Sequence, residues 1–178
     1  MDWIKAIRRH VDAPVIVGGV HLSIYARETL AYPDIDYAVT GEAEVALPEL
    51  IDAIVRHRDL STVRGVAYCQ PDGRVVVTPR AADVDINATP FPARNLIDNS
   101  LYFSFISKYK NFTCFITSRG CPYKCIFCEQ GSKSFRPRSP QNVVDELEVC
   151  VKEHGIRELD FFDSSFTIRK QRVIDICE

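Results

Sequence analysis

Apolar positions along the first 60 residues follow helical and strand-like spacing in turn. Apolar residues three or four positions apart predict helices over 2–11, 23–30 and 42–58. Continuous apolar runs predict short buried strands over 15–19 and 36–39. This order of helix, strand, helix, strand and helix favours a parallel sheet that is covered by helices.

A turn signal follows this first part of the chain. The sequence P-D-G at 71–73 lies between the apolar runs 63–69 and 74–79. Proline presets the φ angle of a turn and glycine accepts a positive φ, so the pattern predicts a β-hairpin. Residues 80–100 contain prolines and show little periodicity, which predicts a linker that crosses a domain boundary.

The last third of the chain shows a second alternation of strand and helix patterns. Apolar runs predict strands over 113–117 and 158–162. Between them, Ser139 and Pro140 match the cap and the first position of a helix, and Gly155 matches its C-terminal cap. The pattern predicts a second α/β segment.

Composition and charge exclude several classes of protein. The 178 residues are 46% hydrophobic and 26% charged, as in globular proteins, which excludes a disordered chain or a coiled coil. The 22 basic and 24 acidic residues give no reason to expect a nucleic-acid or anionic-membrane partner. No apolar run approaches the ~20 residues of a membrane span, and the N-terminus has no signal-peptide core. We therefore expect a cytoplasmic protein.

Seven cysteines indicate metal or redox chemistry, because a disulfide framework is the weaker interpretation for a chain without a secretory signal. Cys121, Cys125 and Cys128 lie within eight residues, on a loop that Gly120 and Pro122 open. Their thiolates can converge on one metal centre. Three thiolates leave one position open, either on a tetrahedral zinc ion or on one iron of a four-iron cluster.

A structural zinc site is the alternative for the three cysteines. It would need a distant fourth ligand, for which Cys114, His154 and Cys69 are candidates. Otherwise we interpret the cysteines outside the motif as thiols that pack as small apolar groups: Cys69, Cys114, Cys150 and Cys177.

The segment from Cys121 to Cys128, C-P-Y-K-C-I-F-C, resembles the signature of radical S-adenosylmethionine enzymes. In that family three cysteines hold a 4Fe-4S cluster, and S-adenosylmethionine (SAM) chelates the fourth iron through its amino and carboxylate groups. Reductive cleavage of SAM then yields a 5′-deoxyadenosyl radical. The resemblance implies that Cys121, Cys125 and Cys128 are the cluster ligands. It also implies that Phe127 borders the adenine of SAM, with plain packing as the alternative.

The residues after the cysteines extend the resemblance. Residues 135–148 are similar to the loop and first helix of the radical SAM barrel, and 159–177 are similar to its second strand and helix. That strand often ends in two acidic residues in the family, whereas Ser164 follows Asp163 here. The resemblance implies that Asp163 lies near SAM, and a helix cap is the alternative. Arg138, part of a short basic run, is interpreted as a surface-loop residue or as a partner of the cofactor carboxylate.

The N-terminal residues resemble a different cofactor domain. The segments 15–23 and 38–51 are similar to the last two β-α units of a cobalamin-binding domain, where loops after the strands contact the nucleotide tail of the corrin. Glycines allow the close backbone approach that such a contact needs. The resemblance implies cobalamin contacts for four residues: Gly18, Gly19, Gly41 and Glu42.

The resemblance implies an α/β fold with three segments. Residues 1–60 are expected to form the C-terminal part of a doubly wound, Rossmann-like cobalamin-binding domain, and 61–112 a β-hairpin and interdomain linker. Residues 113–178 are expected to form the first two β-α units of a TIM-type radical SAM barrel, at about 30 residues a unit. The chain thus resembles the middle of a longer enzyme. We expect it to aggregate alone, or to pack its half-sheets differently, because both sheets end in unpaired strands.

The function implied is that of a cobalamin-dependent radical SAM enzyme. Such an enzyme transfers methyl groups to a small-molecule substrate, or closes a ring oxidatively, with electrons from a flavodoxin- or ferredoxin-type donor. One alternative is a radical SAM enzyme without cobalamin, such as a methylthiotransferase. That class carries three further cluster cysteines in its N-terminal domain, whereas residues 1–68 contain none. The other alternative is a structural zinc-binding module.

Overall fold

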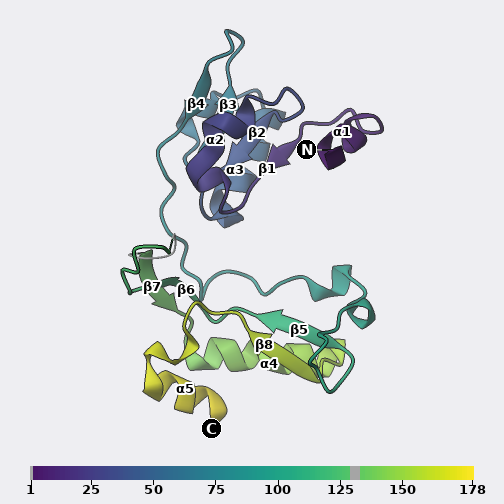
Figure 1. The fold of residues 1–178 in the computed structure, drawn as a ribbon, viewed down its shortest axis with the longest axis vertical. Coiled ribbons are helices and arrows are strands. Elements are labelled where there is room, and N and C mark those ends of the chain that lie inside the picture. The colour runs from purple at the N-terminus through teal and green to yellow at the C-terminus, as the bar shows by residue number, and fades with distance from the viewer. Residues whose placement is uncertain (1, 129–132) are drawn as a thin grey trace. The chain divides into compact units, whose positions relative to one another are not determined.

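The computed structural model describes residues 2–128 and 133–178, which form two compact units (Figure 1). The first unit is Met1–Val84 and the second is Asp85–Glu178. Each unit has its own strands and its own buried core. In the part of the chain that the structure describes, no helix has the length and apolar character that crossing a membrane requires.

The first unit is a four-stranded sheet with helices. Its helices are α1 (Asp2–Arg8), α2 (Leu22–Leu30) and α3 (Ala43–Val55), and its strands are β1 (Ile16–Val17), β2 (Tyr37–Val39), β3 (Val66–Cys69) and β4 (Val75–Val77). A 3-10 turn, η1 (Leu60–Thr62), precedes β3. The strand order is β1-β2-β3-β4, with β1 and β2 parallel and the later pairs antiparallel. The predicted elements are present, with shorter bounds than the patterns suggested except for α2, which begins one residue earlier.

The predicted β-hairpin is confirmed, and it extends the N-terminal sheet. Its turn closes through a hydrogen bond of 2.8 Å from the Gly73 amide to the Gln70 carbonyl, and Gly73 has a φ of 82°. Tyr68 of β3 lies opposite Tyr37 of β2. Val66, also in β3, is fully buried. The hairpin can bury its apolar residues in this way because it joins a larger sheet that helices cover. The expected boundary at residue 60 therefore falls inside one compact unit.

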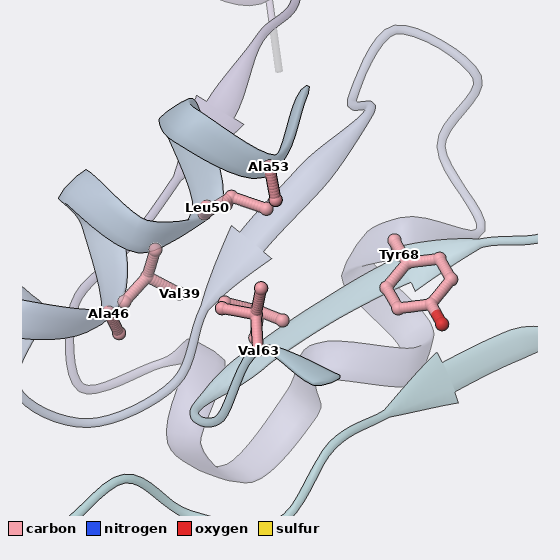
Figure 2. Packing of buried hydrophobic residues seen from close by; sticks show 7 residues of the cluster. Val39, Ala46, Leu50, Ala53, Val63 and Tyr68 are labelled. Carbon is pink, nitrogen blue, oxygen red and sulfur yellow. The ribbon is translucent and has the colours of Figure 1, made fainter. Parts of the chain in front are cut away.

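The sheet of the first unit is covered on both faces. Figure 2 shows α3 against one face, where Leu50 and Ala53 pack with Val39 and Val63. The other face packs on α2 through a second buried cluster: Leu22, Ala26, Leu30, Ile35, Ala38 and Ala67. Neighbouring residues such as Ala38 and Val39 belong to different clusters, because successive side chains of a strand point to opposite faces.

The second unit contains two short sheets. Its strands are β5 (Phe112–Phe115), β6 (Ser118–Cys121), β7 (Lys133–Pro137) and β8 (Glu158–Phe161), and its helices are α4 (Pro140–His154) and α5 (Lys170–Cys177). Three 3-10 turns are η2 (Arg94–Leu96), η3 (Asn99–Leu101) and η4 (Phe166–Ile168). Strands β5 and β8 are parallel neighbours, and β6 and β7 form an antiparallel pair.

Helix α4 begins and ends as its sequence predicted. The Ser139 hydroxyl accepts a hydrogen bond from the Asn142 amide, Pro140 is the first helical residue, and Gly155 adopts a left-handed φ of 61°. The helix packs on β5 and β8 (Figure 1) through a buried cluster: Phe115, Val143, Cys150 and Ile156, with Leu147 and Leu159 at its edge.

The first strand of the second unit is shorter than predicted. β5 ends at Phe115, and after two residues the chain enters β6, which pairs with β7 instead of with β8. The prediction of one strand over 113–117 that runs directly into the cysteine loop is therefore wrong in its last residues. The apolar run continues through the place where the chain changes sheets, so periodicity does not mark this place.

The predictions for the cysteines outside the motif are partly wrong. Cys150 is buried against Phe115, as expected. Cys69, Cys114 and Cys177 are exposed instead. Cys69 ends β3 and Cys177 ends α5, where little structure covers a side chain, and Cys114 alternates with the buried Phe115 and so faces away from it.

Candidate functional site

The three clustered cysteines lie on a β-hairpin, which we call the cysteine hairpin (β6, β7 and the loop between them). Cys121 is the last residue of β6 and lies opposite Lys133 of β7. The pairing register shifts next to Gly120, whose φ is 76°, a backbone conformation that favours glycine. Further along, the Cys128 amide donates a hydrogen bond of 3.1 Å to the Cys125 carbonyl. The motif thus forms a bulged strand end followed by a tight turn.

Residues 122–128 of the loop present their side chains to solvent. Cys125 and Cys128 are exposed and Cys121 is half-buried. Ile126 is fully exposed and Phe127 is 89% exposed, so the residues that the structure describes do not bury this apolar pair. The packing alternative for Phe127 finds no partner among them. Its predicted contact with adenine stays a prediction.

The donor set of the loop suits a sulfur-ligated metal centre. The seven cysteines are all free thiols, and three of them share one accessible loop. Within residues 2–128 and 133–178, no three histidine, cysteine or acidic side chains converge on a common point, so the sulfur atoms are not gathered in advance. Metal binding commonly supplies the free energy that gathers such ligands, since a preformed set of thiolates is self-repulsive. The fourth zinc ligands considered above do not join the loop in this part of the chain either.

Asp163, which follows β8, holds the start of the cysteine hairpin. Its Oδ1 atom accepts hydrogen bonds from the backbone amides of Thr117 (2.6 Å) and Ser118 (3.2 Å). Its Oδ2 atom accepts from the hydroxyls of the same two residues, at 2.5 and 2.6 Å. The helix-cap alternative is wrong, because the cap positions of η4 and α5 are Ser165 and Arg169. A contact between Asp163 and SAM stays a prediction.

Arg138, the residue after β7, is buried, so its interpretation as a surface-loop residue is wrong. Its guanidinium donates to the Ile116 carbonyl at 3.2 Å and to the side chain of Asn142 at 2.6 Å. It also forms an ion pair of 2.5 Å with Glu146, which is 2% exposed. Arg94 contacts the other carboxylate oxygen of Glu146 at 2.6 Å. The result is a buried Arg–Glu–Arg triad.

The triad also touches the aromatic core. The guanidinium groups of Arg94 and Arg138 lie 5.4 and 5.6 Å from the ring centroid of Phe115, within cation–π range. Burial raises the pKa of the Cys150 thiol in the same core, where Glu146 adds to the shift and Arg94 and Arg138 oppose it. The network therefore joins the linker, β5 and α4 in one low-dielectric region.

A further buried arginine, Arg172 of α5, completes the surroundings of the hairpin. Its guanidinium donates to the carbonyls of Thr117 and Arg138, each at 2.8 Å. Burial lowers the pKa of Arg172, the charge of Asp163 raises it, and Arg138 lowers it further. We did not identify this residue or Glu146 from the sequence. For Glu146 a signal existed, since it lies at helical spacing between the buried Val143 and Cys150.

The four residues predicted to contact cobalamin lie at the carboxyl ends of β1 and β2. The strands are parallel neighbours, so Gly18 and Gly19 come to the same edge of the sheet as Gly41 and Glu42. Gly19 and Gly41 have positive φ angles of 108° and 94°, which side-chain-bearing residues rarely adopt. The carboxylate of Glu42 accepts a hydrogen bond of 2.9 Å from the amide of Val84. Their contact with a ligand stays a prediction.

Known proteins resemble the chain over nearly its whole length. It is 35% identical over 171 residues to an uncharacterized methyltransferase of Pyrococcus horikoshii, which covers 91% of this chain and 36% of that protein. It is 33% identical over 173 residues to the anaerobic magnesium-protoporphyrin IX monomethyl ester cyclase of Rubrivivax gelatinosus, with coverages of 94% and 31%. The chain thus spans about a third of the length of these curated relatives. No protein-family profile matches it.

Solved structures share the mixed α/β fold. OxsB, a cobalamin-dependent S-adenosylmethionine radical enzyme with aqua-cobalamin and SAM bound, matches with a TM-score of 0.74 and 25% identity, over 99% of this chain and 25% of that one. The radical SAM methyltransferase TsrM from Kitasatospora setae, with cobalamin and a [4Fe-4S] cluster bound, matches with a TM-score of 0.68 and 28% identity, over 98% and 35%.

Proposed function

The chain is homologous to the cobalamin-dependent radical SAM enzymes, and from this we propose that it acts in radical SAM chemistry with Cys121, Cys125 and Cys128 as ligands of a 4Fe-4S cluster. The observation that carries the proposal is the set of three free thiols on one loop of the cysteine hairpin. Three thiolates suit a cluster whose fourth iron binds another ligand.

The residues of the loop have distinct parts in this proposal. The three thiols would lose their protons on binding iron, and the exposure of Cys125 and Cys128 allows a cluster to be delivered. A cluster held by these thiolates would supply the electron for reductive cleavage of SAM. Phe127 then offers an apolar face to the adenine, which would cover a ring that is 89% exposed. Asp163 is proposed to lie near the same cofactor, from the end of β8.

The finer division of the fold is part of the proposal. Residues 1–60, with the hairpin of 61–112 added to their sheet, correspond to the end of a Rossmann-like cobalamin-binding domain, and 113–178 to the first β-α units of a radical SAM barrel. Ligands of open α/β sheets bind at the carboxyl ends of the strands. Gly18, Gly19 and Gly41 therefore border the nucleotide tail of cobalamin. Glu42 contributes through its backbone, since its carboxylate binds the Val84 amide.

The reaction class follows from the relatives. Those described above are a methyltransferase and a cyclase, and the matching structures hold cobalamin, SAM and a 4Fe-4S cluster. We propose methyl transfer or oxidative cyclisation of a small-molecule substrate, with electrons from a flavodoxin- or ferredoxin-type protein. The methylthiotransferase alternative is disfavoured, because the matching structures hold cobalamin.

Anaerobic reconstitution tests the cluster. We expect the chain to bind about four iron and four sulfide ions when it is supplied with both, as one cubane cluster requires. After reduction, electron paramagnetic resonance (EPR) should show a [4Fe-4S]+ signal that changes when SAM is added. Cys125→Ala should abolish the signal, and Cys177→Ala, which removes an exposed thiol outside the motif, should leave it intact. Uptake of zinc without any EPR signal, or an intact signal in Cys125→Ala, would contradict the proposal.

A further inference from the structure

The base of the cysteine hairpin (Ile116, Thr117, Ser118 and Arg138) is the place where the chain leaves one sheet and enters another. β5 ends just before it and pairs with β8, whereas β6 begins within it and pairs with β7. A hydrogen bond of 2.9 Å from the Arg138 amide to the Thr117 carbonyl closes the hairpin at this point. The direction in which β6 and β7 leave the parallel sheet is therefore set here.

Side chains hold several of the other backbone groups of the base. Asp163 binds the amides of Thr117 and Ser118, and Arg172 binds the carbonyl of Thr117. The Ile116 carbonyl accepts from the Arg138 guanidinium. Thr117 is fully buried and Ser118 is 5% exposed, so the backbone groups of these two residues would lack water if their partners were removed.

The loop beyond the base has a different character. Cys121 is only three residues past Ser118, at most ~10 Å along an extended chain. Cys125 and Cys128 are exposed, and the turn between them is closed by its own backbone hydrogen bond. A rotation of the base therefore moves the first cysteine directly. Residues 125–128 are all exposed, so packing against the described residues does little to oppose it.

We propose that Asp163 and Arg172 are positioning residues that fix the orientation of the cysteine hairpin, and through it the environment of the metal centre on its loop. The inference rests on the proposed function for the cluster itself. It assigns to Asp163 a role that its four hydrogen bonds to Thr117 and Ser118 carry, whether or not the same residue also contacts SAM.

The two carboxylate oxygens of Asp163 bind different partners, and this difference makes the proposal testable. Oδ1 binds the two backbone amides and Oδ2 binds the two hydroxyls. In Asp163→Asn the amide oxygen can keep the backbone contacts, and the NH2 group can donate to the hydroxyls of Thr117 and Ser118 once these rotate. Asp163→Ala removes all four contacts. The positioning role therefore predicts rescue by asparagine.

Hydrogen–deuterium exchange of the chain without iron measures the first part of the proposal. In Asp163→Ala, we expect the amides over 117–121 to exchange at least about tenfold faster than in the unaltered chain, since a local opening no longer breaks charge-assisted hydrogen bonds. Asp163→Asn should stay within about threefold of it. Asp175→Ala is the matched control, since it removes an exposed carboxylate from α5. Arg172→Met removes the hydrogen bonds to the Thr117 and Arg138 carbonyls and should also accelerate exchange.

EPR of the reconstituted protein measures the second part. Asp163→Ala should bind as much iron as the unaltered chain, because its cysteines are intact. Its reduced signal should split into several species with a shifted midpoint potential, and Asp163→Asn should restore the single species. Unchanged exchange in both Asp163→Ala and Arg172→Met, or faster exchange with an unaltered EPR signal and potential, would overturn the proposal. If the unaltered chain forms no cluster, the proposed function fails and the role at the metal centre fails with it, while exchange still reports whether Asp163 holds the base.

Discussion

Replacing Glu146 by alanine should destabilise the second unit strongly. Glu146 is 2% exposed and lies between Arg94 and Arg138, which are 6% and 8% exposed. Its removal would leave two guanidinium groups buried without the carboxylate that pairs with them. Breaking a buried ion pair by deleting one partner costs about 3–5 kcal/mol. With a urea m-value of about 2 kcal/mol/M, this corresponds to a fall of about 2 M in the unfolding midpoint.

The assay is urea unfolding followed by circular dichroism, with a control on the same helix. Glu148 also belongs to α4 and pairs with Lys152 at 2.5 Å, but both side chains are more than half exposed. Glu148→Ala should therefore change the free energy of unfolding by less than about 0.5 kcal/mol. A loss below about 1 kcal/mol in Glu146→Ala would refute the reasoning, because the two arginines would then reach water or other partners without cost.

A second variant separates the cost of leaving buried charges unpaired from the net contribution of the triad to the free energy of unfolding. Replacing Arg94, Glu146 and Arg138 together by apolar residues of similar volume removes the buried charges along with their pairing. Such replacements are often neutral or stabilising by about 1–4 kcal/mol. We therefore expect the triple variant to be more stable than Glu146→Ala. If it is less stable, the hydrogen bonds of Arg138 to the base of the hairpin outweigh the cost of burying its charge.

Three further outcomes are expected. Gly19→Ala should weaken binding of aqua-cobalamin in an absorbance titration at least about tenfold more than Gly73→Ala, although both glycines have a positive φ and open space for a Cβ, so that the strain is matched. Phe115→Ala should lower the free energy of unfolding by about 3–5 kcal/mol in the urea assay, since the ring is 1% exposed. Because burial raises the pKa of Cys150 in the folded state, the stability it contributes is complete below the unfolded pKa of about 8.5 and is lost as the pH rises above it. Alkaline melting curves should show this loss, and Cys150→Ala should reduce it where Cys177→Ala does not.

Local signals account for the elements that the sequence predicted well. The caps of α4 at Ser139 and Gly155 act within a few residues, and so does the turn at Gly73. Each depends on the backbone geometry of one residue type, which the sequence states directly. The α/β character of the second unit followed from the order of strand and helix patterns, and the resemblance implied the parallel pairing of β5 with β8.

The parts that were missed depend on contacts distant in sequence. Arg138 looked like a surface residue because nothing near it in the chain is acidic, and its partner Glu146 is eight positions away on a helix. Arg94 is 52 residues from the same carboxylate. The exposure of Cys114 depends on which face of β5 packs against α4. The sequence of a four-residue strand does not show which face that is.

The candidate site shows the same division. The cysteine spacing indicated the chemistry of the loop, because three sulfur ligands within eight residues are a property of the sequence alone. The sequence did not indicate the hydrogen bonds of Asp163, because they join residues 45 and 46 positions apart. The sequence thus predicted the ligands of the site but not the residues that hold them in place.

The base of the hairpin holds both ends of the cysteine loop, which makes the loop an exchangeable cassette. Thr117 and Arg138 are joined by a backbone hydrogen bond, and the parallel pairing of β5 with β8 ends before them, at Phe115 and Phe161. Loops of other lengths and other ligand sets can therefore be grafted between them without changing the register of β5 and β8. Each doubling of the loop length costs only about 0.6 kcal/mol in closure entropy. The same scaffold is thus a starting point for engineering metal sites of different nuclearity.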